Sequence, residues 1–382
     1  MTSLSIDVVQ GTVPLQAIAA EWDAIVPPTF TAALTQSGWY FACQDAFPAK
    51  ELVAVTARMG GRLIGVLPLL LMRTDARGLF FSQVTTFSRG DYQPPILGID
   101  ALPGVLPAMV DAAIGHFGRR IVYWWARLPI TEPSLEVLRS HLGQLGMSIT
   151  EQVEVAPRLH IAGRSYAEIE ATWSPSHRTD VRRQRKRLAG VNPISLWEPQ
   201  SLDEAHSLLD ELFTVHDEKW LSQGLPGRFQ NSTERKHFGA IVQRLWGRGL
   251  HMSALRCGTI NVSFGFGFFA AGWVQWYRPT YRTEFHNMSP GKVHIALLLE
   301  EACRRKWSGI DFLLGAEGYK LQWSNEQLRV IDLYASFSKW APAYQWFTRG
   351  KPYVRDRLGP MYARFKARLQ NGLSSKPVAG KR

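Results

Sequence analysis

The order of apolar and polar positions along the 382 residues predicts short strands mixed with amphipathic helices. In the first half, two apolar runs cover residues 52–57 and 63–71, and Gly60-Gly61 separates them. Two strand-like runs around a glycine pair predict a β-hairpin. Helices are predicted over residues 17–25 and 106–117, and a buried strand over residues 121–125.

The second half repeats this order of elements roughly 200 residues later. It predicts helices over residues 202–220 and 290–306 and strands over residues 250–256, 262–269, 273–277, 310–314 and 330–337. Each half therefore reads as an antiparallel meander that leads into a helix and then a strand, which is an α/β (α+β) unit. We expect a first domain over residues 1–155, a second over 156–340 and a tail over 341–382.

Length and composition agree with two globular domains. The chain is longer than one hydrophobic core usually supports, and 46% of its residues are hydrophobic. Cys43, Cys257 and Cys303 lie far apart, so the sequence predicts neither a disulfide framework nor a metal site. Residues 1–10 lack a secretory signal, and the longest apolar run, residues 63–72, is too short to span a membrane. We expect a cytoplasmic protein.

The formal charge of +12 favours partners that carry phosphate, such as nucleotides, anionic membranes or nucleic acids. Basic residues gather in segments 178–187 and 349–382. In the tail, aromatic residues such as Trp346 and Tyr353 alternate with Arg349 and Lys351, a mixture typical of segments that lie on an anionic interface. The tail therefore suggests a peripheral position on the inner face of the membrane. A helix packed back on the second domain is the alternative.

The basic segment itself predicts a helix that begins after Ser174 and Pro175 and ends at Gly190. Its residues Arg178, Arg182 and Arg185 share one face. That face is suited to a phosphorylated ligand or substrate, and a solvated basic surface is the alternative. Nucleic acid is disfavoured as a partner because no aromatic residue is interleaved with these arginines.

The clearest candidate site precedes the helix predicted at residue 290. Ser289 is suited to the N-cap position, and Pro290 is suited to the first helical position. Gly291 would let a ligand approach the free backbone N–H groups, where the helix dipole favours an anion such as pyrophosphate. An ordinary capped helix is the alternative.

A second candidate site follows the strand predicted over residues 310–314. The sequence Gly315-Ala316-Glu317-Gly318 presents Glu317, Tyr319 and Lys320 at the carboxyl end of a strand, where α/β sheets bind ligands. Glu317 could remove a proton from an amine, and Tyr319 could protonate a leaving thiolate. The alternative is a surface ion pair between Glu317 and Lys320.

One histidine has a plausible chemical role. His216 lies four residues before Trp220 on one helical face and could transfer protons, although such histidines more often pack through hydrogen bonds. The chain contains no Gly-x-Ser-x-Gly elbow, His-Glu-x-x-His pair or Walker loop. The sequence therefore offers no basis for a hydrolase, metalloprotease or NTPase of those classes.

Together these segments resemble the BioF2-like acetyltransferases of the GNAT superfamily, a group also described as cellulose-biosynthesis-associated acyltransferases and related to the Fem-type aminoacyltransferases. The resemblance rests on the basic helix 178–188, on His216 with Lys219-Trp220, on the Ser289-Pro290-Gly291 helix start and on segment 311–320. In the first half, Gly38-Trp39 and segment 61–69 look like the same family.

The resemblance implies a tandem GNAT-like fold with two mixed sheets flanked by helices. It also implies transfer of an acyl group from acyl-CoA, as co-substrate and with no permanently bound cofactor, to an amine. We expect a cell-envelope, polysaccharide or lipid precursor as the acceptor. At the start of the helix predicted at residue 290, the chain has Ser-Pro-Gly-Lys in place of the usual GNAT loop Arg/Gln-x-x-Gly-x-Gly/Ala, so an aminoacyl-tRNA donor, as in Fem-type enzymes, is the main alternative. A non-catalytic protein that binds a phosphorylated ligand or nucleic acid is the other.

Under this hypothesis the residues divide by role. Glu317 or His216 would act as the base and Tyr319 as the acid. The donor would be bound by Ser289, Gly291 and Lys292 and by the backbone of Trp276 and Tyr277. The substrate would be bound by Trp220, Arg178, Arg182 and Lys320. The sequence indicates no oligomeric state.

Overall fold

The computed structural model describes residues 3–337 except 48–51, 77–78, 87–88 and 102. The predicted tail, residues 341–382, lies outside the described residues. Among the helices of the described part, none combines the length and the apolar character that crossing a membrane requires.

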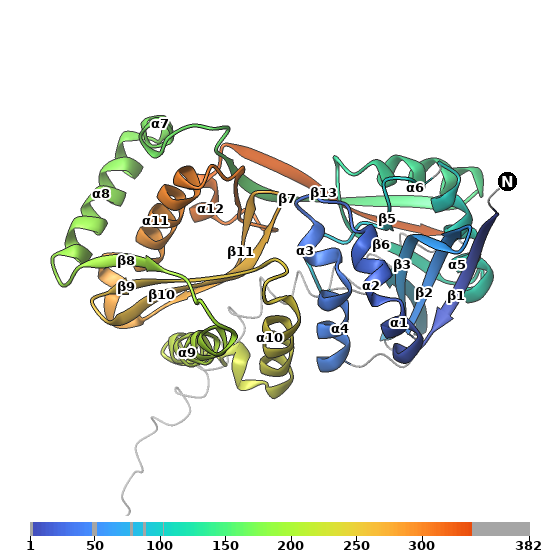
Figure 1. The fold of residues 1–382 in the computed structure, drawn as a ribbon, viewed down its shortest axis with the longest axis horizontal. Coiled ribbons are helices and arrows are strands. Elements are labelled where there is room, and N and C mark those ends of the chain that lie inside the picture. The colour runs from blue at the N-terminus through green and yellow to red at the C-terminus, as the bar shows by residue number, and fades with distance from the viewer. Residues whose placement is uncertain (1–2, 48–51, 77–78, 87–88, 102, 338–382) are drawn as a thin grey trace, which may run out of the picture.

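The first half begins with an antiparallel meander beside a group of short helices (Figure 1). The predicted hairpin is confirmed, because β2 and β3 pair around Gly60-Gly61 and both glycines have positive φ. The elements of this half are β1 (Leu4–Gln10), α1 (Thr12–Ala17), α2 (Ala19–Ile25), α3 (Ala32–Thr35), α4 (Ser37–Ala46), β2 (Leu52–Met59), β3 (Arg62–Ala76), β4 (Leu79–Thr86), β5 (Ile96–Leu97), α5 (Val105–Phe117), β6 (Val122–Pro129), α6 (Pro133–Gln144) and β7 (Ser148–His160).

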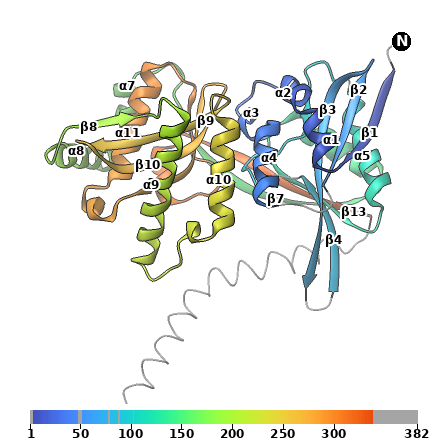
Figure 2. The ribbon, with the colours of Figure 1, turned by 60° about the horizontal axis from the view of Figure 1, so that its bottom comes forward.

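The second half repeats the meander, and helices cover both of its faces. Helices α9 and α10 lie side by side on one face, and α8 and α11 pack together on the other (Figures 1 and 2). Its elements are α7 (Tyr166–Thr172), α8 (Pro175–Ala189), β8 (Ile194–Trp197), α9 (Leu202–Leu221), η1 (Arg228–Gln230), α10 (Ser232–Leu245), β9 (Leu250–Cys257), β10 (Ile260–Ala270), β11 (Trp273–Tyr281), η2 (Thr283–Met288), α11 (Pro290–Arg304), β12 (Gly309–Asp311), α12 (Gly318–Trp323) and β13 (Glu326–Ser336).

The two predicted sheets are joined into one mixed sheet. Its order is β1-β2-β3-β4-β6-β13-β7-β12-β11-β10-β9-β8, and β5 pairs with β3. The last described strand, β13, lies between β6 and β7 of the first half, and β7 pairs on its other side with β12 of the second half. The predicted domain boundary at residues 155/156 lies inside β7. The division of the chain into these domains stays a prediction.

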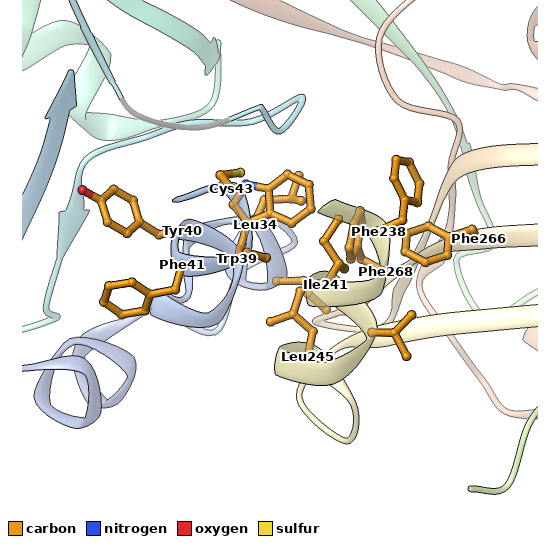
Figure 3. Packing of buried hydrophobic residues seen from close by; sticks show 14 of the residues in the cluster. Leu34, Trp39, Tyr40, Phe41, Cys43, Phe238, Ile241, Leu245, Phe266 and Phe268 are labelled. Atoms are coloured by element: carbon orange, nitrogen blue, oxygen red, sulfur yellow. The ribbon is translucent and has the colours of Figure 1, made fainter. Parts of the chain in front are cut away.

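The halves also meet through two helices, α4 and α10. Gly38 permits their close approach, because a Cβ atom there would lie 3.0 Å from Leu245 Cδ2 and 3.2 Å from the Arg244 carbonyl oxygen. Trp39 of α4 is buried and packs edge-on against Phe268 of β10 (Figure 3). A buried aromatic cluster therefore holds the halves together beside the continuous sheet.

Several predicted elements have different ends in the structure, among them the following two. The helix expected over residues 17–25 begins at Ala19, as α2, because the helical backbone breaks at Ile18 after α1. The strand expected over residues 310–314 ends at Asp311, because the backbone turns at Leu313, whose φ is +60°. This turn directs the following segment toward the candidate site.

Candidate functional site

A cavity of about 730 Å³ lies at the carboxyl end of β12. Strand β11, the first turn of α11, the end of α9 and the segment from Phe312 to Trp323 supply most of its lining. Asp91, Arg127 and Glu154 come from the first half of the chain. The cavity therefore depends on both halves and has a volume in the range of small-molecule sites.

The cavity opens where β11 and β12 separate. These parallel strands pair only over residues 273–275 and 309–311, and β11 continues alone to Tyr281 on that side among the described strands. On its other side β11 contains a bulge: Phe266 pairs with Arg278 and Gly267 pairs with Trp276, so Tyr277 is the extra residue. Trp276 and Tyr277 both line the cavity, as the predicted donor site requires.

The first turn of α11 forms one end of the cavity. Ser289, Gly291 and Lys292 all line it. Open space surrounds Gly291, where an added Cβ atom would meet only Tyr281 Cδ1, at 3.8 Å. Lys292 is paired through its ammonium group with Asp180 of α8. The helix start is thus open to a ligand, and one of its cations is already neutralised.

The predicted capping by Ser289 is wrong in its detail. Ser289 occupies the N-cap position, but its side chain makes no capping hydrogen bond. Its backbone is left-handed, with φ of +45°, whereas a capping serine is normally extended. The Ser289 carbonyl oxygen instead accepts a hydrogen bond from the Lys292 N–H at 2.9 Å.

The segment after β12 brings Glu317 and Tyr319 to the cavity, and both line it. The ion pair that was the alternative to a catalytic role also forms: Lys320 Nζ lies 2.9 Å from Glu317 Oε2 and donates to the Leu314 carbonyl oxygen at 2.7 Å. Lys320 is buried, whereas the Glu317 side chain is 58% exposed. Glu317 can therefore meet an acceptor while Lys320 holds it in place.

The phenol of Tyr319 is protonated near pH 7, as a proton donor must be. Tyr319 is 41% exposed, and partial desolvation of its phenol, helped by the nearby Glu317 carboxylate, raises the pKa of Tyr319. Its phenol therefore stays neutral near pH 7.

His216 does not line the cavity. Its Nε2 accepts a hydrogen bond from Trp220 Nε1–H at 3.1 Å, and its Nδ1 lies 3.4 Å from Asp217 Oδ1. Burial lowers the pKa of His216, so the ring is neutral at pH 7. The nitrogen that would act as a base is thus occupied by Trp220, which lines the cavity and takes its orientation from this bond.

The predicted arginine face of α8 lies away from the cavity. Arg182 pairs with Glu170 at 2.5 Å, and Arg185 pairs with Glu300 of α11. Neither Arg178 nor Arg182 is among the lining residues. The structure therefore brings together Trp220, Trp276, Tyr277, Ser289, Gly291, Lys292, Glu317, Tyr319 and Lys320, and leaves His216, Arg178 and Arg182 outside.

Sequence analysis missed several lining residues with charged side chains. Asp91 accepts a hydrogen bond from the Leu314 N–H at 3.2 Å and pairs with Arg127 at 2.7 Å. Lys219 lies over the Tyr281 ring at 3.9 Å, and burial lowers its pKa. Arg278 follows the bulge in β11 and lies just beyond the predicted end of that strand. The sequence could have indicated Lys219 and Arg278, because each is next to a predicted site residue: Lys219 precedes Trp220, and Arg278 follows Tyr277.

Comparisons with known proteins cover the part of the chain that forms this cavity. Residues 175–321 match a family model described as an acetyltransferase (GNAT) domain, and the match includes the α11 start and Glu317. No curated protein sequence matches the chain.

Several solved structures have the same fold over most of the chain. FemX is 11% identical, with a TM-score of 0.58, and the match covers 89% of this chain and 99% of FemX. A domain named as the C-terminal DUF2156 domain of a lysylphosphatidylglycerol synthetase from Agrobacterium fabrum is 10% identical, with a TM-score of 0.53 and coverage of 85% and 92%. A conserved protein of unknown function from Bacteroides thetaiotaomicron is 13% identical, with a TM-score of 0.53 and coverage of 87% and 100%.

These structural likenesses show the fold, and the family match extends from α8 to α12. They confirm the α/β fold and the resemblance to GNAT proteins expected from the sequence. Within the second half, residues 175–321 are similar to an acetyltransferase domain of the GNAT class, which supports an acyltransferase.

Proposed function

We propose that this protein is an N-acyltransferase that moves an acyl group from acyl-CoA, or another acyl thioester, to an amine. The main support for this proposal is that the first turn of α11, Glu317 and Tyr319 line one and the same cavity. A donor and an acceptor bound at these two places would meet over the separated end of β11.

The donor would bind at the start of α11. The N–H of Gly291 and the helix dipole favour an anion such as the pyrophosphate of CoA there, and Gly291 leaves room for it. The thioester would lie along β11, where backbone N–H groups near Trp276 and Tyr277 would stabilise the developing negative charge on its oxygen. One such donor is worth about 3 kcal/mol in comparable sites.

The acceptor would react beside Glu317. An ammonium group cannot attack a carbonyl, so Glu317 would first take its proton. The amine then forms the C–N bond as the C–S bond breaks, and Tyr319 gives its proton to the departing thiolate. The proton held by Glu317 returns to Tyr319 through water. No covalent intermediate with the enzyme is required, and His216 supports the site by orienting Trp220.

An aminoacyl-tRNA donor is the second candidate. Two observations favour it: the start of α11 lacks the usual GNAT pyrophosphate loop, and the chain's fold resembles that of FemX over 89% of its length. The same groups would then catalyse attack on an ester in place of a thioester.

The acceptor that we favour belongs to the cell envelope, as a polysaccharide or lipid precursor. The fold likeness to a domain named for lysylphosphatidylglycerol synthesis supports a lipid acceptor. The basic residues of the chain support a position on the inner, cytoplasmic face of an anionic membrane.

One experiment tests the donor and the base together. The full chain is incubated with panels of acyl-CoAs or aminoacyl-tRNAs and of amines, and mass spectrometry detects the acylated product. We expect transfer from acyl-CoA to fall about 10²- to 10⁴-fold in Glu317→Gln, because a general base contributes about that factor. The matched control is Glu326→Gln, which changes an exposed carboxylate outside the cavity.

Transfer from aminoacyl-tRNA alone would replace the acyl-CoA proposal with the second candidate. Full transfer by Glu317→Gln would remove Glu317 as the base.

A further inference from the structure

Each half of the chain contains the same strand-helix-strand unit. In the first half β4 and β6 are parallel and pair over residues 83–85 and 122–124, with α5 between them in sequence. In the second half β11 and β12 pair over three residues in the same way, with α11 between them. The catalytic cavity lies between the segment before α11 and the segment after β12. The corresponding place in the first half lies between the segment before α5 and the segment after β6.

A second cavity occupies that corresponding place. Its volume is about 400 Å³, and its lining includes residues 94–99, which precede α5, and residues 132–134, which follow β6. Five of its lining residues are prolines, which fix the backbone and preform the cavity: Pro27, Pro94, Pro95, Pro103 and Pro133.

The chemistry of this second cavity differs from that of the first. Among its described lining residues, Glu132 is the one with an ionisable side chain, and none is basic. The catalytic cavity, in contrast, is lined by Arg127, Lys219 and Arg278 among other cations. A phosphate-bearing donor therefore fits the catalytic cavity and is repelled by the second one.

Several hydrogen-bond donors of the second cavity are already used within the protein. The Thr35 hydroxyl donates to the Thr31 carbonyl oxygen, and the Ser134 hydroxyl donates to Glu132 Oε1. The backbone N–H groups of Gly98 and Ala101 are bonded within the protein, and the five prolines have none. A ligand that bonds to the Glu132 carboxylate must itself supply the donor.

We propose that this cavity is a second ligand site, for a molecule with an ammonium group and an apolar body. The ammonium group would pair with Glu132, and the body would pack against the prolines and against Ile96 and Leu106. Burial raises the pKa of Glu132, so a bound cation would stabilise a carboxylate that is otherwise costly to ionise. The site is independent of the acyl-transfer cavity and of the donor proposed for it.

Calorimetric titration of the full chain with three probes tests this site. The probes are n-octylammonium, n-octanol and octanoate, which share one apolar body and differ in charge. We expect octylammonium to bind most tightly and octanoate to bind least. Glu132→Gln should weaken octylammonium binding about tenfold and leave octanol binding unchanged, because a hydrogen bond to a charged group is lost.

Three variants show in which cavity the probe binds and serve as controls. Val137→Trp fills the cavity and should abolish binding of octylammonium and octanol alike. Glu136→Gln, on the same helix but outside the cavity, should bind as the natural protein does. Glu317→Gln, in the catalytic cavity, should also leave octylammonium binding unchanged.

The proposal is overturned if octylammonium does not bind or if octanoate binds as tightly as octylammonium. It is also overturned if octylammonium binding weakens in Glu317→Gln and is unchanged in Glu132→Gln. Because none of these titrations contains an acyl donor, failure of the proposed transfer reaction would leave their outcome unaffected.

Discussion

Replacing Asp311 by asparagine should destabilise the protein more than most single substitutions. Asp311 is fully buried at the end of β12. It accepts hydrogen bonds from Tyr92 Oη at 2.9 Å, from Arg158 Nε at 3.0 Å and from the Leu313 N–H at 2.9 Å. Arg158 belongs to β7 and Tyr92 to the first half, so one carboxylate ties both halves to the turn that lines the catalytic cavity.

The expected magnitude follows from these partners. In Asp311→Asn the negative charge is lost, so Arg158, itself almost fully buried, loses its partner charge, and the new NH₂ group must face one of the donors that the carboxylate accepted from. Breaking a buried ion pair on one side costs about 3–5 kcal/mol. Tyr92→Phe removes only the phenol hydrogen bond to the carboxylate, which is worth about 1.5–3 kcal/mol.

Urea-induced unfolding, followed by tryptophan fluorescence, measures how far the free energy of unfolding falls in Asp311→Asn and in Tyr92→Phe relative to the natural protein. Asp210→Asn is the control, because Asp210 is exposed on α9 and should change the free energy of unfolding by no more than about 0.5 kcal/mol. Catalytic turnover should also fall in Asp311→Asn, because the Leu313 turn loses its anchor. A loss below about 1 kcal/mol in Asp311→Asn would refute this role.

Three further substitutions test other parts of the structure. Gly38→Ala should destabilise the contact between α4 and α10 by about 1–3 kcal/mol in thermal unfolding, whereas Gly115→Ala, with open space around it, should not destabilise. Burial lowers the pKa of His294 to about 3, so below pH 6.5 the unfolded chain binds a proton that the folded chain does not, and stability falls. Between pH 7 and pH 5, the free energy of unfolding measured in urea titrations should therefore fall about 2 kcal/mol less in His294→Asn than in the natural protein. An equal fall in both proteins would contradict this. Tyr319→Phe should slow transfer but keep the shape of the pH–rate profile between pH 6 and pH 10, because the pKa of Tyr319 is about 12. Loss of the basic limb of that profile would show that Tyr319 titrates in this range.

Local patterns in the sequence were sufficient for the elements and for part of the site. The hairpin at Gly60-Gly61 depends on a glycine turn between two apolar runs, and the start of α11 depends on Pro290. Glu317 and Tyr319 follow a buried strand, so their place at its carboxyl end could be predicted without knowing the strand's neighbours. Each of these features is set by residues close together in the chain.

Features set by distant residues could not be predicted. The insertion of β13 between β6 and β7 depends on pairing across the whole sheet, for which hydrophobic patterning contains no partner information. Asp91 reaches the cavity from the first half through its bond to the Leu314 N–H. The left-handed backbone at Ser289 and the bond between Trp220 and His216 likewise depend on the packed structure.

Hydrogen–deuterium exchange of the full chain tests most directly whether the start of α11 holds the donor. Acetyl-CoA should slow exchange of the Gly291 backbone amide, measured in a peptide that covers residues 289–293, and of the amides in the free end of β11. Gly291→Val should fold, because open space surrounds Gly291, yet lose this protection and acetyl-CoA binding together. Binding of acetyl-CoA with unchanged exchange at residues 289–293, or undiminished binding by Gly291→Val, would contradict the account.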